Sequence, residues 1–223
     1  MKSKLKFFII LSLLFAFLPS FGKKAENTDT ISIRRAFLDL PSETLDILSK
    51  NARFYMLAYL DNDSLVNVEN NFQGLSHIEK ATPDYLKVSL TPASSIQLKI
   101  LKLKSGAEIV MSIYTTGEEG DAADSAISFF DSSLRPLQSS TFFPAPKIED
   151  FVNTKGFDTG IKEIKEMLPF YSFRFEANPE NDNITGRLSY NDILPIEDSK
   201  IIQLVAKPNV TYVWDGKQFK IKK

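Results

Sequence analysis

The sequence predicts an α+β protein with an antiparallel sheet of about eight strands and helices packed on one face of that sheet. Three observations support this prediction. Apolar residues recur at helical spacing before residue 60 and again between residues 148 and 168. From Asp84 onward the period changes to two, which is typical of strands with one wet face. The composition, 43% hydrophobic and 12% aromatic, is that of a globular chain with a substantial core.

Residues 1–22 have the three-part pattern of an export signal. Lysines at the start precede an apolar stretch, Phe7–Leu18, and the small-x-small cleavage site Ser20–Gly22. The apolar stretch is shorter than the roughly 20 residues that span a bilayer as a helix. We therefore expect a mature chain of residues 23–223 in the periplasm, at the cell surface or in the medium, with no stable membrane anchor.

Charge and composition exclude several classes of function. The formal net charge of −1 gives no reason to expect nucleic acid as a partner. The chain has no Cys and a single His, His77, whereas zinc sites and nucleophilic triads draw on those residues. We therefore expect no cofactor and assign no catalytic, cofactor-binding or metal-ligating residue.

In the first half, one helix precedes a meander of strands. Ser42 can cap a helix whose apolar residues Leu45, Leu48 and Ala52 recur at spacings of three and four. Residues 54–58 extend this helix or form a second one, and residues 23–30 form a loose leader. The strands, recognised by alternation and by Gly-rich turns, are expected at residues 86–90, 96–99, 108–114 and 126–130.

In the second half, Pro144 and Pro146 interrupt the pattern before a new start. Helices are expected at residues 148–152 and 161–168, and strands at residues 171–177, 184–190, 201–206 and 210–214, before a terminal hairpin ending at 221. The sequence thus predicts helices followed by strands in both halves. This pattern leaves two interpretations open: a single α+β domain over residues 23–223, or a tandem helix-plus-four-strand repeat with halves 31–140 and 145–223.

Several segments between Arg53 and Gly117 resemble an uncharacterised family of exported proteins from Bacteroidales bacteria. The matching segments are Arg53–Leu57, Asn71–Ser76, Thr82–Leu86, Leu90-Thr91 with Ser94-Ser95, and Tyr114–Gly117. The resemblance is looser over the C-terminal third. It implies export and a chain of about this length, and no functional residues are carried over with it.

Three short sites are similar to the Asp-Ser/Thr-aliphatic acceptor sequence of periplasmic O-glycosylation in these bacteria. They are centred on Thr30, Ser64 and Ser125. All three fall in expected loops or termini, where a glycan would not disturb packing. The alternative is chance occurrence, since three residues make a short motif.

Several other residues that could suggest a metal site, a catalytic site or a ligand-stacking site are more simply explained by structural roles. Residues 61–64 begin like a calcium loop, but Leu65 stands where the next ligand belongs. Glu118, Glu119, Asp121 and Asp124 are typical of a solvated turn. Trp214 shares a strand side with Tyr212, which favours a place in the core.

The polar side of the predicted sheet is the candidate partner-binding surface. If the strands share one sheet with helices on its other side, Lys87, Lys99, Arg174 and Arg187 lie on one open face. Such a face can orient an acidic protein surface or glycan, although a merely solvated face is the simpler alternative. We therefore expect an exported, non-catalytic binding protein, with a carboxylate- or metal-dependent glycan or peptidoglycan hydrolase as the alternative.

Overall fold

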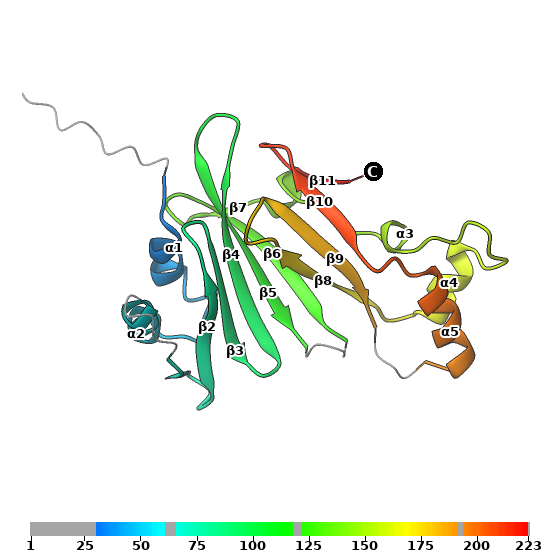
Figure 1. Cartoon of the computed structure of the whole chain (residues 1–223), viewed down its shortest axis with the longest axis horizontal. Helices are drawn as coiled ribbons and strands as arrows, with labels where there is room; N and C mark the ends of the chain where they lie inside the picture. The colour runs from blue at the N-terminus through cyan, green and yellow to red at the C-terminus, as the bar shows by residue number, and fades with distance from the viewer. Residues whose placement is uncertain (1–29, 61–65, 118–121, 191–193, 223) are drawn as a thin grey trace, which may run out of the picture.

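The computed structural model describes residues 30–60, 66–117, 122–190 and 194–222. It confirms the α+β class, with helices and antiparallel sheets arranged in layers (Figure 1). The strands form a seven-stranded sheet and a four-stranded sheet, where the sequence predicted a single sheet of about eight strands. None of the helices in these ranges is long and apolar enough to cross a membrane.

Two helices open the described chain. Helix α1 (Ile33–Asp39) begins at Ser32, whose hydroxyl accepts from the Arg35 amide at 3.2 Å, and lies just after the expected leader. Helix α2 (Lys50–Leu60) begins after Ser49, whose hydroxyl accepts from the Ala52 amide at 3.1 Å. The helix expected from Ser42 is wrong over residues 41–48, where turns bury the apolar side chains instead.

The seven-stranded sheet is a meander in which sequence neighbours pair throughout. Its strands are β1 (Val68–Glu69), β2 (Leu75–Ala81), β3 (Tyr85–Thr91), β4 (Ser94–Lys102), β5 (Glu108–Thr116), β6 (Asp124–Asp131) and β7 (Pro136–Leu137). One face packs against α1 and α2, with Leu86, Val88 and Leu90 in the same core cluster as Phe37 and Met56. The expected register of β3 is thus confirmed.

The rest of the chain builds the second sheet and a small helical cluster. Its elements are the short helix η1 (Ser139–Thr141), α3 (Ile148–Phe151), α4 (Ile161–Met167), β8 (Ser172–Ala177), β9 (Asn183–Ser189), α5 (Ile196–Val205), β10 (Val210–Trp214) and β11 (Phe219–Ile221). The sheet order is β11-β10-β9-β8. The halves differ in strand number and in the position of α5, and the duplication of residues 31–140 in 145–223 stays a prediction.

The strand expected at residues 201–206 is wrong, because most of this segment lies in α5. Pro195 precedes the helix, and Glu197 and Asp198 occupy its first turn, where carboxylates interact favourably with the helix dipole. Ile202 and Val205, three residues apart, pack with Ile148 and Ile164 in a core of their own. Helices α4 and α5 lie at the opposite end of the molecule from α1 and α2 (Figure 1).

The two sheets pack face to face. Tyr85, Met111 and Phe129 of the first sheet share a core cluster with Phe175 and Tyr212 of the second. The first sheet is therefore covered on both faces, by α1 and α2 on one side and by the second sheet on the other. The expected open polar face on β3 and β4 is wrong for the part that the second sheet covers.

Candidate functional site

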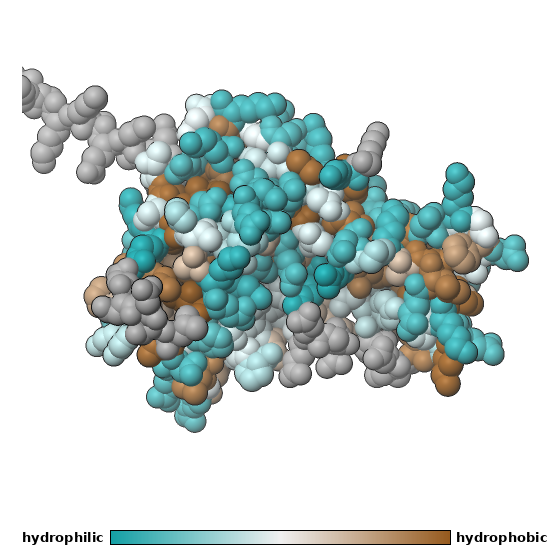
Figure 2. Space-filling view, viewed as in Figure 1, coloured by the Kyte–Doolittle hydropathy of each residue, from teal (hydrophilic) through white to brown (hydrophobic). Residues whose placement is uncertain are grey.

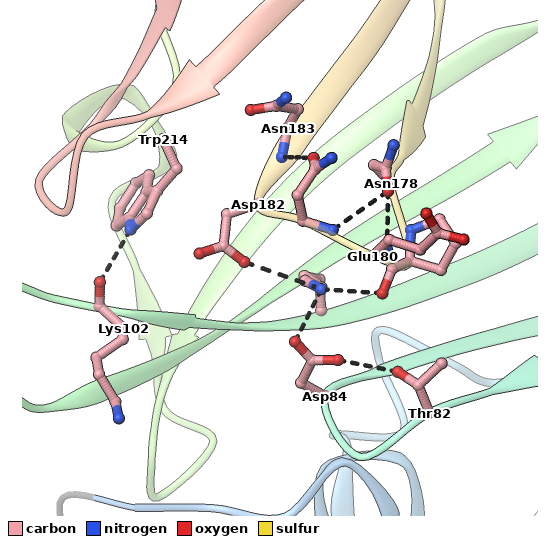
Figure 3. Close-up of polar contacts among 11 residues, drawn as sticks. Thr82, Asp84, Lys102, Asn178, Glu180, Asp182, Asn183 and Trp214 are labelled. Carbon is pink, nitrogen blue, oxygen red and sulfur yellow. Dashed lines mark hydrogen bonds and ion pairs between the residues drawn. The ribbon is translucent and has the colours of Figure 1, made fainter.

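Lys99, expected on an open face, is buried at the junction of the two sheets, with a side chain only 2% exposed. Its ammonium donates to Asp84 Oδ2 at 2.8 Å and to the Pro179 carbonyl at 3.4 Å, and it lies 3.8 Å from Asp182 Oδ1 (Figure 3). Asp84 belongs to the β2–β3 turn and Asp182 to the β8–β9 turn. A buried ammonium requires such partners, so Lys99 joins the sheets and does not offer its charge to another molecule.

The two carboxyl groups of this cluster differ in their pKa. Partial burial raises the pKa of Asp84, but hydrogen bonds from Lys99 and Thr82 outweigh it, so the pKa of Asp84 lies below its usual value. Burial raises the pKa of Asp182 above its usual value, against the opposing effect of Lys99. Lys99 therefore pairs chiefly with Asp84, which is also the closer carboxylate.

Polar residues of the first sheet also complete the hydrogen bonding of β8, the edge strand of the second sheet. Gln97 Oε1 accepts from the Ala177 amide at 3.0 Å and from the Tyr85 hydroxyl at 3.1 Å. Ser125 Oγ accepts from the Phe175 amide at 3.0 Å. These side chains satisfy backbone donors that would otherwise be buried without a partner.

The three expected glycosylation sites fall in different surroundings. Thr30 is exposed, in keeping with a terminal position. Ser64 lies outside the described residues. Ser125 stands in β6 and not in a loop, and its hydroxyl also lies 2.8 Å from Thr115 Oγ1. Glycosylation of these residues stays a prediction, and Ser125 loses the loop position that favoured it.

Arg174 and Arg187 are brought together as directly opposite residues of β8 and β9. Phe175 and Ile184 belong to the core between the sheets and alternate with the arginines along β8 and β9, so the two arginines lie on the outer face of the second sheet. Arg174 Nη2 donates to Glu176 Oε1 at 3.2 Å, and Arg187 Nε donates to Asn209 Oδ1 at 2.8 Å. We call Arg174, Glu176, Thr185 and Arg187 the arginine face.

Lys87, the remaining predicted binding residue, belongs to β3 of the first sheet. It is half-buried and pairs with Glu79 at 2.7 Å. Burial raises the pKa of Tyr85, and the charges of Glu176 and Glu79 raise it further. The structure therefore separates the residues predicted to bind a partner. Arg174 and Arg187 adjoin each other, Lys87 pairs with Glu79 on the first sheet, and Lys99 is interior.

The remaining candidates have structural surroundings or lie outside the described residues. Trp214 packs against Phe142 and Phe219, and its Nε1 donates to the Lys102 carbonyl at 2.9 Å (Figure 3), so it lies partly buried against the core between the sheets and not fully inside it. His77 is half-buried on β2. Residues 61–65 and 118–121 are not among those described. In the part that is described, no group of three or more His, Cys, Asp or Glu could hold a metal ion.

Sequence reasoning missed two neighbouring pockets around α1 and α2. One, of about 540 Å³, lies between these helices and the β2–β3 turn, and the other, of about 410 Å³, lies between the helices themselves. Both are lined by Arg34 and Leu57. Phe54 and Tyr55 could have indicated this surface from the sequence, because helical spacing places them on a different side of the helix from Met56 and Leu57. In the structure they are 57% and 56% exposed, whereas Met56 and Leu57 are buried.

Comparison with known proteins shows the fold and the family. A solved structure, that of a domain of an uncharacterized protein from Porphyromonas gingivalis W83, matches with a TM-score of 0.71 and 18% sequence identity, over 85% of this chain and 96% of that chain. At this identity the likeness shows the fold alone. No curated protein matches the chain. A family model described as "Protein of unknown function (DUF3256)" matches residues 26–219, which confirms the expected uncharacterised family. The chain belongs to this DUF3256 family.

Proposed function

We propose that this protein is an exported, non-catalytic binding protein that recognises an acidic protein surface or glycan through the arginine face. The observation that carries the proposal is the direct pairing of Arg174 with Arg187 across β8 and β9. Like charges opposite each other on neighbouring strands destabilise a sheet. Glu176 offsets the charge of Arg174, whereas Arg187 bonds to the neutral Asn209. A ligand with an anionic group would relieve the remaining repulsion and gain charge-assisted hydrogen bonds.

Both guanidinium groups are also held in place. Glu176 orients Arg174, and Asn209 orients Arg187. A guanidinium has five N–H donors, and among the described residues each of these two makes a single hydrogen bond. Side chains that are already oriented lose less conformational entropy on binding, which supports a recognition role.

Export supports the same proposal, because it would place the arginine face where envelope glycans and proteins are found. The signal over residues 1–22 predicts cleavage after Gly22. Mass spectrometry of protein recovered from the cell envelope should find Lys23 as the first residue. A cytoplasmic pool that retains residues 1–22 would contradict export.

The binding test compares captured partners. Mature wild-type protein and an Arg174→Gln/Arg187→Gln variant are immobilised and exposed to envelope extract at low salt. A Lys162→Gln/Lys217→Gln variant is the matched control, since it removes the same charge from exposed positions outside the arginine face. Unchanged melting temperatures establish that all three proteins are folded.

We expect wild type and control to retain an acidic protein or glycan that the arginine variant loses, and we expect salt to weaken its retention. Protease and glycosidase treatment of the extract distinguish the two kinds of partner. Identical captured sets for wild type and the arginine variant would overturn the proposal.

The hydrolase alternative has no specific observation in its favour. Of the four acidic residues at the expected solvated turn, Glu118, Glu119 and Asp121 lie outside the described residues, and Asp124 is exposed at the start of β6. His77 pairs with Ser89 in the β2–β3 ladder.

A further inference from the structure

We infer, on the basis of the proposed function, that the ligand of the arginine face is an acidic glycan and that one of its sugars lies in a small polar pocket beside Arg187. The pocket has a volume of about 230 Å³ and lies between α3 and the ends of β10 and β11. Its polar lining consists of Asp150, Lys207, Asn209, Thr211 and Lys222.

Two contacts make the pocket continuous with the arginine face. Arg187 Nε donates to Asn209 Oδ1 at 2.8 Å, and Asn209 lines the pocket. Thr185 of the arginine face pairs directly with Thr211, another lining residue, so their side chains lie on the same side of the second sheet. Figure 2 shows a mainly hydrophilic surface over the middle of the molecule, where β9 lies (Figure 1). One ligand can therefore contact the arginines and fill the pocket.

The pocket offers both donors and acceptors, which suits the hydroxyl groups of a sugar. The Lys207 ammonium donates to the Asp150 carbonyl at 2.8 Å, which holds the half-buried lysine in place. The Thr211 hydroxyl and the Asn209 amide can each donate and accept, as a sugar hydroxyl does. The Asp150 carboxylate can accept from a hydroxyl but would repel an anionic group. The negative charge of the ligand should therefore lie outside the pocket, at the arginines.

The size of the pocket also favours a glycan over an acidic protein surface. Pockets for drug-sized ligands have volumes of roughly 300 to 1,000 Å³. A smaller polar pocket suits a single sugar that belongs to a longer chain. An acidic protein surface would need only the arginines, and a carboxylate side chain that entered the pocket would meet Asp150.

Isothermal titration calorimetry of the mature protein at low salt tests the inference. The probes are oligosaccharides that carry glucuronate, galacturonate or phosphate groups, each compared with its neutral counterpart. Thr211→Val and Asp150→Asn are the pocket variants, because they remove a hydroxyl and a charge with little change in side-chain size. Thr141→Val and Asp158→Asn, at exposed positions outside the pocket lining, are the matched controls. Unchanged melting temperatures establish that all variants are folded.

We expect an acidic oligosaccharide to bind at least about tenfold more tightly than its neutral counterpart. Each pocket variant should weaken this binding about three- to tenfold, as expected for the loss of one hydrogen bond, and the controls should not. Full affinity in both pocket variants would overturn the inference. Tighter binding by Asp150→Asn would also overturn it, by placing the anionic group in the pocket.

Binding of no acidic oligosaccharide in the panel would overturn the inference as well. The proposed function fails separately, because it requires that the Arg174→Gln/Arg187→Gln variant lose a partner captured from envelope extract. If that partner is an acidic protein, the proposed function stands and the assignment of a glycan is wrong.

Discussion

At the scale of single residues, the most informative side chain is Lys99, whose charge is used inside the protein. The two carboxylates around it have side chains that are 48% and 44% exposed, whereas Lys99 is 2% exposed. Loss of a carboxylate therefore leaves a charge that water cannot reach, whereas loss of Lys99 leaves charges that water can solvate. This asymmetry predicts which substitution costs more.

We expect Asp84→Ala to lower the free energy of unfolding by about 1 to 3 kcal/mol, less than for a fully buried pair because Asp84 is half exposed. Lys99→Met should cost less, since methionine fills a similar volume and leaves no buried charge. Urea denaturation of the two variants and wild type measures the difference. A larger loss for Lys99→Met than for Asp84→Ala would show that the ammonium itself is the main stabilising group.

The same cluster predicts a dependence of stability on pH. The pKa of Asp84 is lower in the folded protein, so its contribution is complete above the unfolded pKa of about 3.9 and is lost as the pH falls through the folded pKa. The raised pKa of Asp182 acts in the opposite direction, because protonation relieves the burial of its charge. Urea denaturation between pH 2 and 7 should therefore show the cost of Asp84→Asn shrinking below about pH 3.9. A cost that stays constant over this range would contradict the assignment.

At the scale of elements, the edge of β8 explains why polar residues of the first sheet are buried. Gln97→Leu would leave the Ala177 amide and the Tyr85 hydroxyl without this acceptor, which should cost about 1 to 3 kcal/mol. Ser95→Ala, at a half-buried position on the same strand, is the control and should stay within about 0.5 kcal/mol. Hydrogen exchange should also show faster exchange of the Ala177 amide in Gln97→Leu. Equal stabilities for the two variants would remove Gln97 from the account of how the sheets join.

Helices and strands are predicted correctly from the sequence where local periodicity determines them. The prediction fails where the burial of a residue depends on partners far away in the chain. Leu86, Val88 and Leu90 alternate with polar residues, and the register of β3 follows from that pattern. Lys99 and Gln97 are polar residues of the kind found on a solvated strand face. They are buried because Asp182 and the edge of β8, about 80 residues away in the chain, pack against them. Residues 201–206 fit a strand or a helix equally well, and packing against α3 and α4 selects the helix.

At the scale of the whole molecule, the first sheet lies between two helices and the second sheet. Helices α1 and α2 cover one side of the first sheet, and the second sheet covers the other and turns the arginine face outward. Arg174 and Arg187 could be proposed as binding residues from alternation alone, but their direct pairing depends on the register of β8 with β9. The pockets at α1 and α2 could not be predicted from the sequence. They depend on how the helices pack against the β2–β3 turn, and local patterns do not specify that packing.

Photo-crosslinking in intact cells tests the central claim, that the arginine face binds a partner in the cell envelope. A photoreactive phenylalanine replaces Thr185, which pairs with Glu176 beside the two arginines, and a control protein carries it at exposed Gln203 of α5. We predict a discrete adduct from position 185 that disappears in the Arg174→Gln/Arg187→Gln background and does not form from position 203. No adduct at position 185, or one that persists without the arginines, would contradict the claim.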